Sequence, residues 1–262
     1  MQGSCECGSV KFESDGPWRS INVCHCGQCR KTSGHIWAAT AVPKEALRII
    51  KGDNLVWRES SDVARRGFCG ECGSSLFYDR HAAPHTAVAP GALDDETGLE
   101  IENHIFEEDR GDYYQSPTGP ATSGEWDAPV PGSCECGSVR LTVIEKPISS
   151  WICHCEQCRK SSGYLWAGAQ LQADGYQVIS DETLKWYQST DRAKKGFCSD
   201  CGSTIFWWME GRAAPAVSLG ILDSPTGINL DKHVFVAERA DYEVIEDDLP
   251  QAQLFDLETP GP

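Results

Sequence analysis

The sequence predicts a mainly β protein in which one fold is repeated in tandem, and two observations support this fold class. First, the two halves repeat each other at a spacing of 129 positions: GSCECGSV at Gly3 recurs at Gly132, and RRGFCGECGSSLF at Arg65 recurs as KKGFCSDCGSTIF at Lys194. Second, each half consists of short segments rich in β-branched and aromatic residues, separated by Gly, Asp and Asn, which is typical of strands and turns. Duplication of one β domain without net insertion explains both observations.

The expected strands follow one another in the same order in both halves. In the first half they are ALRIIKG, NLVWRES, SSLFYD and HTAVAPGAL, and in the second half YQVIS, TLKWYQS, STIFWWM and PAVSLGIL. Neither half sustains the apolar period of a long helix. We expect only a single helical turn after the third cysteine of each CHCxxC run, in CRKTSGHIW and CRKSSGYLW.

A change in composition marks the junction between the halves. Residues 115–131, QSPTGPATSGEWDAPVP, are rich in Pro, Gly, Ser and Thr, as linkers are. We therefore expect a first domain at 1–114, a linker at 115–131, a second domain at 132–247 and an acidic tail at 248–262. Leu254 and Phe255 could pin the tail, but we expect a loosely held terminus. An intramolecular pseudo-dimer of the two domains is the expected arrangement.

Charge excludes several classes of partner. The 262 residues carry a formal net charge of −16, which disfavours a nucleic-acid surface because phosphate binding needs clustered Lys and Arg. No apolar run is long enough to span a bilayer, and the N-terminus lacks the plan of a signal peptide, so we expect a cytoplasmic protein without a membrane partner. The 14 cysteines are then metal ligands or reactive thiols rather than disulfides.

The cysteines divide into two kinds of group in each half. A CxC pair and a distant CxxC pair provide four thiols for a closed, structural zinc site. The expected ligands are Cys5, Cys7, Cys69 and Cys72 in the first half and Cys134, Cys136, Cys198 and Cys201 in the second. In the FCxxCGS segments, Gly73 is expected to relieve the tight turn after the second sulfur.

Three cysteines remain in each half, within the runs INVCHCGQCRK and WICHCEQCRK. Zinc with three protein ligands and one open position is the arrangement of a catalytic site. We therefore predict open, catalytic zinc sites at Cys24, Cys26 and Cys29 and at Cys153, Cys155 and Cys158, for up to four zinc ions per chain.

Alternatives to the open site remain. His25 or His154 could complete a closed site, although alternate side chains of an extended segment point to opposite faces, which turns the histidine away from a metal held by its neighbours. The three thiols could also bind no metal and be redox-prone, or two of them could oxidise to a disulfide.

Basic residues lie beside the cysteine groups: Arg30, Lys31, Arg65, Arg66, Arg159, Lys160, Lys194 and Lys195. We expect them chiefly to offset thiolate charge. Alternatively, some of them, with Arg30 and Arg159 as candidates, contact the carboxylates of an anionic thiol substrate.

Other polar and aromatic residues have a structural and a functional interpretation. Trp37, Trp166, His35 and Tyr164 follow the three-cysteine runs and either line a substrate pocket or pack in the core. His104 and His233 are candidate acid–base groups, with a structural role favoured. Asp94 and Asp223 are expected to cap turns.

The combination of GxCxCGxV, CHCxxCRKxSG, GFCxxCGS, GxLD and a late H-[IV]-F resembles the glutathione-dependent formaldehyde-activating domain, also found in centromere protein V. The resemblance spans nearly all of each half and matches all seven cysteines in order. It implies an Mss-four-like, three-sheet β fold, with the same division into structural and catalytic zinc sites.

The resemblance further implies a carbon–sulfur lyase that joins a glutathione-like low-molecular-weight thiol to formaldehyde or a related small electrophile. The substrate thiolate would bind zinc at the open position. The alternatives are a non-catalytic, zinc-stabilised binding module, or one active and one inert half.

Overall fold

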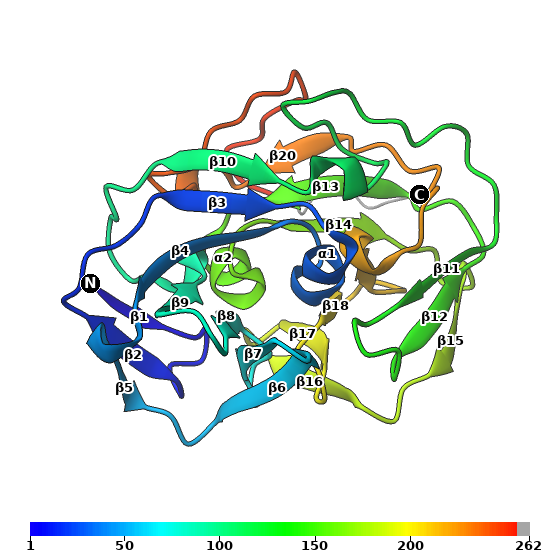
Figure 1. The fold of residues 1–262 in the computed structure, drawn as a ribbon. Coiled ribbons are helices and arrows are strands. Elements are labelled where there is room, and N and C mark those ends of the chain that lie inside the picture. Colours follow the sequence, from blue (N-terminus) through cyan, green and yellow to red (C-terminus); the bar gives the residue numbers. More distant parts are fainter. Residues whose placement is uncertain (256–262) are drawn as a thin grey trace.

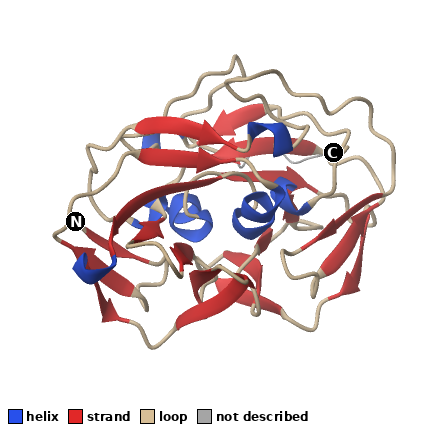
Figure 2. Ribbon diagram, viewed as in Figure 1, coloured by secondary structure: helices blue, strands red, loops and turns tan. Residues whose placement is uncertain are grey.

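The structure, a computed structural model, describes residues 1–255 and confirms a mainly β fold built twice in tandem (Figures 1 and 2). Residues 256–262, the end of the expected acidic tail, lie outside the described residues. Among residues 1–255, no helix has the length and apolar character needed to cross a membrane.

The elements of the two halves follow the same order with few differences. The first half contains β1 (Gln2–Ser4), β2 (Lys11–Ser14), β3 (Ile21–Cys24), α1 (Gly27–Ser33), β4 (Trp37–Pro43), η1 (Lys44–Ala46), β5 (Leu47–Lys51), β6 (Leu55–Ser61), β7 (Ala64–Cys69), β8 (Ser75–Arg80), β9 (His85–Val88), η2 (Pro90–Ala92), β10 (Ile101–Ile105) and η3 (Glu107–Asp109). The second half contains β11 (Val130–Ser133), β12 (Arg140–Val143), β13 (Ser149–Cys153), α2 (Glu156–Ser162), β14 (Trp166–Gln170), β15 (Tyr176–Ser180), β16 (Leu184–Gln188), β17 (Ala193–Cys198), β18 (Thr204–Met209), β19 (Ala216–Ser218), η4 (Leu219–Ile221), β20 (Lys232–Val234) and η5 (Val236–Glu238).

Each half forms a three-stranded and a seven-stranded sheet, where the family resemblance implies three sheets. The orders are β1-β2-β5 and β10-β3-β4-β9-β8-β7-β6 in the first half, and β11-β12-β15 and β16-β17-β18-β19-β14-β13-β20 in the second. Strand β4 pairs with β3 over Trp37 to Ala39 and with β9 over Thr40 to Pro43. Because β4 takes part in both pairings, it joins β10 and β3 on one side to β9, β8, β7 and β6 on the other, and the seven strands form one sheet.

The helix that carries the third cysteine begins earlier than the sequence predicts. In α1 the Cys26 side chain accepts a hydrogen bond from the Cys29 backbone N–H and caps the first turn. Gly34 ends the helix in a left-handed conformation (φ 88°), which glycine adopts without strain. Cys155 and Gly163 play the same parts in α2.

The two helices lie next to each other at the centre of the molecule, between strands of the two halves (Figure 1). Each helix end contacts the 3-10 turn of the other half: the Gly220 N–H donates to Gly34 O at 2.8 Å, and the Gly91 N–H donates to Gly163 O at 3.0 Å. A Cβ at Gly220 would lie 2.3 Å from Arg30 O. The two halves therefore pack through reciprocal, backbone-close contacts.

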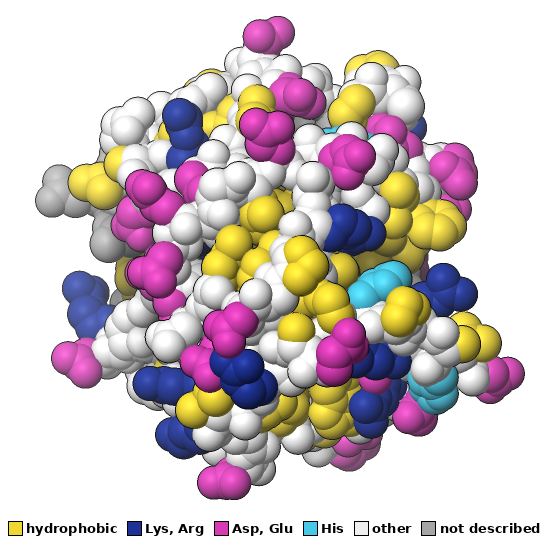
Figure 3. Space-filling view, turned by 60° about the vertical axis from the view of Figure 1, so that its left-hand side comes forward, with side chains coloured by type: hydrophobic (Ala, Val, Ile, Leu, Met, Phe, Trp, Pro, Cys, Tyr) yellow, Lys and Arg dark blue, Asp and Glu magenta, His cyan; other side chains and the backbone are white. Residues whose placement is uncertain are grey.

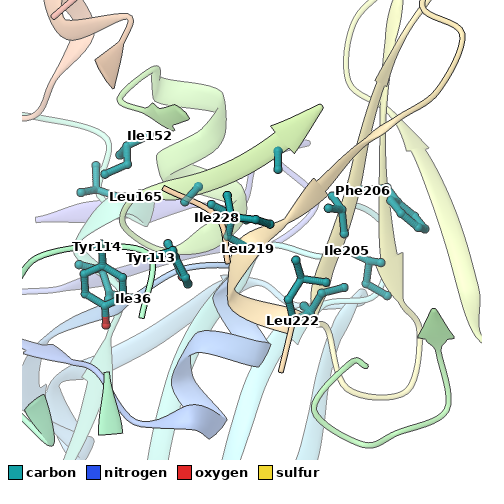
Figure 4. Packing of buried hydrophobic residues seen from close by; sticks show 14 of the residues in the cluster. Ile36, Tyr113, Tyr114, Ile152, Leu165, Ile205, Phe206, Leu219, Leu222 and Ile228 are labelled. Atoms are coloured by element: carbon teal, nitrogen blue, oxygen red, sulfur yellow. The ribbon is translucent and has the colours of Figure 1, made fainter. Parts of the chain in front are cut away.

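A hydrophobic cluster crosses this contact (Figure 4). Ile36 and Tyr113 of the first half are buried in the same cluster as Ile152, Leu165 and Leu219 of the second. Apolar burial across the junction stabilises the pair of halves as one unit.

Residues 248–255, the described part of the expected tail, are held more firmly than we expected. The Ala252 N–H donates to His233 O, and the Ala252 carbonyl accepts a hydrogen bond from the Val236 N–H. The Phe255 side chain packs against aromatic residues of the second half, while Leu254 remains exposed. Contact of the Phe255 ring with this apolar surface stabilises the position of residues 248–255.

Candidate metal centres

The structure brings together the two predicted groups of four cysteines. In each group the four Sγ atoms all lie within 4.8 Å of one another. The Sγ atoms of Cys5 and Cys7 are 3.5 Å apart, and those of Cys7 and Cys69 are 3.8 Å apart. Gly73, directly after the CxxC pair, has φ 78°, so it relieves the turn as the sequence predicts.

The donor sets of these groups fit zinc. Zinc–sulfur bonds of about 2.3 Å in a tetrahedron place the sulfurs about 3.8 Å apart. The Cys134–Cys136 and Cys136–Cys198 distances of 3.4 and 3.7 Å lie near that value. Both groups tie the CxC loop after β1 or β11 to the turn after β7 or β17, so an ion there would join distant parts of each half.

The two groups of three cysteines also assemble. Cys24 ends β3, Cys26 caps α1 and Cys29 lies inside the helix, and their Sγ atoms fall within 4.8 Å of one another. We call this group cluster A, and the group formed by Cys153, Cys155 and Cys158 cluster B. Among the described residues, neither cluster has a fourth Cys, His, Asp or Glu at ligand distance.

His25 points away from cluster A, as strand alternation predicts. Its Nδ1 pairs with the Tyr114 hydroxyl and its Nε2 with His104 Nδ1, both at 2.9 Å. Burial, followed by the effect of His104, lowers the pKa of His25 to about 4, so the ring is neutral at pH 7. His154 is turned away in the same manner, with partners Glu243 and His233.

Cluster A lies at a large cavity of about 580 Å³, within the range of ligand pockets. The residues that line it include Arg19, Asn22, Cys24, Cys26, Gln28, Cys29, Trp37, Arg66, Tyr78, Arg80, His85, Ile105 and Phe106. Figure 3 shows the side of the molecule that the first half occupies, where hydrophobic side chains gather between acidic and basic ones. The cavity combines an apolar wall with several cations, in a protein that is acidic overall.

Arg66 is the cation in contact with cluster A. Its Nη2 donates to Cys29 Sγ at 3.3 Å and to Gln28 Oε1 at 3.2 Å, and its guanidinium lies over the rings of Trp37 and Tyr78. The buried Nε and Nη1 have no hydrogen-bond partner among the described residues. Hydrogen bonds from the Cys24 and Cys26 thiols lower the pKa of Cys29, and Arg66 lowers it further. Burial acts in the opposite direction, but the pKa still lies well below its usual value.

Cluster B has the same sulfurs in different surroundings. The cavity that the described residues form beside Cys158 measures about 10 Å³, about the space one water needs. Lys195, the counterpart of Arg66, donates to Glu6, to Gln157 O and to Ser161 Oγ. All three donors of its ammonium group are therefore taken by protein partners.

The cations at Arg30 and Arg159, the candidates for binding a substrate carboxylate, point elsewhere. Arg30 donates to His25 O and Asp109 O, and it is absent from the residues that line the cluster A cavity. Arg159 donates to His154 O and Glu238 O. Their role toward a substrate stays a prediction, whereas Arg19 and Arg80, which the sequence analysis did not single out, line the cavity.

The lysines after these arginines join the two halves. Lys31 Nζ lies 2.9 Å from Asp223 Oδ1, and Lys160 Nζ lies 2.5 Å from Asp94 Oδ1. Asp94 also accepts a hydrogen bond from the Ser4 hydroxyl. Asp94 and Asp223 thus act in reciprocal ion pairs between halves.

The aromatic candidates divide between the cavity and the junction. Trp37 lines the cavity, and its counterpart Trp166 packs beside Cys158. His35 and Tyr164 are both buried beside the junction of the halves and do not line the cluster A cavity. His104 and His233 pair with the buried histidines of the CHC runs, which fits the structural role that the sequence analysis favoured.

Comparison with known proteins identifies the family. The family model described as glutathione-dependent formaldehyde-activating enzyme (GFA) matches residues 1–109 and again residues 129–238. The chain therefore belongs to the GFA family, with two tandem copies of its domain.

Two individual proteins are similar to this chain. An uncharacterised lyase of Schizosaccharomyces pombe is 27% identical over 116 residues, which cover 42% of this chain and 80% of the relative. The crystal structure of a Rhodobacter sphaeroides protein is 26% identical with a TM-score of 0.33, and the match covers 40% of this chain and 100% of that one.

Proposed function

We propose that the first half is a zinc-dependent carbon–sulfur lyase that joins a glutathione-like thiol to formaldehyde or a related small electrophile and also catalyses the reverse cleavage. The observation that carries this proposal is cluster A, a three-cysteine group without a fourth protein ligand among the described residues, at a cavity of about 580 Å³. Membership of the GFA family and the lyase name of the S. pombe relative support the same reaction class.

In the proposed reaction, the thiol sulfur bonds to the aldehyde carbon and the thiol proton ends on the former carbonyl oxygen. No atom is oxidised or reduced overall, so no further reactant is needed. Zinc held by Cys24, Cys26 and Cys29 would keep the substrate thiol ionised at neutral pH. The four-cysteine groups would hold structural zinc, for up to four ions per chain.

The residues of this chain would position the reactants. Arg66 lines the cavity beside the Cys29 sulfur, so its guanidinium would offset negative charge that develops on the aldehyde oxygen, where prearranged donors are most effective. Arg19 and Arg80 in the cavity lining suit the carboxylates of a glutathione-like thiol. The rings of Trp37 and Tyr78 provide an apolar wall that limits water at the sulfurs.

For the second half we propose a non-catalytic role, because Lys195 is fully engaged and Phe255 packs against the cluster B residues. The domain bounds 1–114 and 132–247 and a cytoplasmic location remain part of the proposal. The 14 free cysteines suit a reducing compartment.

Exchange between glutathione and formaldehyde, followed by NMR, tests the proposal. We expect the intact protein to accelerate exchange, Cys24→Ser to abolish the acceleration and Cys153→Ser to retain most of it. Zinc content is measured on the same samples, and we expect the mild chelator that empties cluster A to stop exchange. An exchange rate no greater than the spontaneous one for the zinc-loaded intact protein would overturn the proposed reaction.

A further inference from the structure

The wall of the cluster A cavity has a counterpart in the second half, but its composition differs. The 129-residue repeat places Trp151 where the first half has Asn22, Trp207 where it has Tyr78, and Phe235 where it has Phe106. The first-half members of these pairs all line the open cavity. The second half therefore has a more aromatic wall around cluster B.

The Phe255 side chain packs against the three aromatic residues of that wall. Its ring centroid lies 5.2 Å from that of Trp151, 6.3 Å from that of Trp207 and 6.2 Å from that of Phe235, with which it is stacked. Phe255 thus occupies the place that corresponds to the cavity of the first half. The first-half residue Phe106, the counterpart of Phe235, is 52% exposed.

Backbone hydrogen bonds bring Phe255 to this place. The His233 N–H donates to Pro250 O at 2.8 Å, the Ala252 N–H to His233 O at 2.9 Å and the Val236 N–H to Ala252 O at 3.1 Å. Gln251 forms a parallel bridge with His233 at the edge of β20. The segment is added to the seven-stranded sheet of the second half as a short edge piece, a mode of binding that extended peptides use in general.

The attachment of this segment is limited. Phe255 is only partly buried and its neighbour Leu254 is 64% exposed. Arg212 and Lys232 lie over the Phe255 ring at 5.6 and 5.9 Å from its centroid, and both reach it from the surface of the second half. Segments held by few buried contacts open without unfolding of the domain.

We propose that residues Pro250–Phe255 are a removable strap that closes cluster B, so that the molecule carries one open and one latent three-cysteine site. Release of the strap exposes an aromatic pocket beside the cluster B sulfurs, which suits an apolar or aromatic thiol rather than the anionic thiol proposed for cluster A. The strap concerns the second half and does not depend on which reaction the first half catalyses.

Thiol accessibility to a bulky aromatic disulfide, 5,5′-dithiobis(2-nitrobenzoate), tests the strap on the full chain treated with a mild chelator. Mass mapping of modified peptides gives separate rates for the two clusters. We expect rapid modification of cluster A and slow modification of cluster B in the intact protein. A chain that stops after Leu249, and the variant Phe255→Ala, should modify cluster B at least tenfold faster, with the cluster A rate unchanged.

Two controls make the outcome specific. A chain that stops after Phe255 retains the strap and should behave as the intact protein. Phe106→Ala removes the first-half counterpart of Phe235 and should leave cluster B slow. If the chain that stops after Leu249 also exposes the thiols of the four-cysteine groups, it has lost its fold. The Phe255→Ala variant then tests whether the strap protects cluster B. Equal rates for the two clusters in the intact protein, or an unchanged cluster B rate in Phe255→Ala, would overturn the strap.

Discussion

The Nζ atom of Lys195 in the second half lies 2.8 Å from Oε2 of Glu6 in the first half, and the side chains of both residues are less than a tenth exposed, at 7% and 4%. Burial would lower the pKa of Lys195, but Glu6 and the cluster B thiolates raise it above its usual value. The ammonium group therefore stays charged, and the ion pair connects the two halves beneath their surface.

Loss of one partner of this pair should be costly, because the other charge remains buried. We expect Glu6→Gln to lower the free energy of unfolding by about 3–5 kcal/mol, measured by denaturant unfolding. The matched change Glu135→Gln removes the ion pair with Arg58, whose atoms lie 3.3 Å apart and whose side chains are 29% (Arg58) and 12% (Glu135) exposed. It should cost less than Glu6→Gln, because Arg58 keeps more contact with water than Lys195 does. Equal effects of the two changes would contradict this interpretation of the Lys195 pair.

The reciprocal glycine contacts give a second prediction. A Cβ at Gly220 would lie 2.3 Å from Arg30 O and 2.6 Å from the carbonyl carbon of Gly34, so Gly220→Ala should force the halves apart and lower the melting temperature strongly. Gly27→Ala is the control, because the nearest atom to its Cβ is a flexible Arg30 nitrogen at 3.9 Å. It should leave the melting temperature unchanged or raise it slightly, since alanine favours helix.

An unpartnered indole gives a third prediction. The Trp166 Nε1–H donates to the Ser218 hydroxyl at 2.8 Å. In the first half, Trp37 Nε1 is buried and has no hydrogen-bond partner within residues 1–255, and Ala89 takes the place of Ser218 in the repeat. Ala89→Ser should supply that partner and stabilise the protein by about 1 kcal/mol, and Ser218→Ala should destabilise it by about 1–3 kcal/mol. Thermal unfolding of both variants checks the opposite signs.

Arg66 gives a fourth prediction, about activity. Arg66→Gln should lower kcat for the proposed exchange by about 10²-fold or more, because preorganised donors to developing charge have effects of that size. Arg65→Gln, at a partly exposed neighbour paired with Asp79, should leave the rate within about twofold. A loss of activity in Arg66→Gln that is explained by lost zinc content would contradict a role in the reaction itself.

The buried His35 gives a fifth prediction, about pH. Burial, followed by the effects of the neighbouring His25 and Arg30, lowers the pKa of His35 well below its usual value of 6.5. The unfolded chain then binds a proton below pH 6.5 that the folded chain does not, so His35 contributes to a loss of stability as the pH falls through that value. His35→Tyr, which introduces the residue of the second half, should reduce the slope of unfolding free energy against pH below 6.5.

Much of the site followed from cysteine spacing alone. Fourteen thiols in two identical sets leave few ways to form tetrahedral sites, and alternation along an extended CHC run turns His25 away. The start of α1 did not follow, because a cysteine side chain as the helix cap is a weak sequence signal compared with Ser, Thr, Asp or Asn.

The difference between the clusters could not be predicted for a similar reason. Arg66 and Lys195 are equivalent in sequence, and their different partners depend on how Glu6 and Glu135 meet the opposite half. Phe255 reaches cluster B only because the chain turns back beside β20. The partners of Arg66 and Lys195 and the position of Phe255 depend on tertiary packing, and alignment of the two repeats gives no information about tertiary packing.

Covalent fusion of the two domains has an evolutionary consequence. In a homodimer of identical subunits, every substitution appears at both active sites, so one site cannot be lost while the other is kept. A fused pair is free of that constraint while the Gly34–Gly220 and Gly163–Gly91 contacts preserve the shared scaffold. One gene can therefore keep one centre under selection and let its twin drift toward another use.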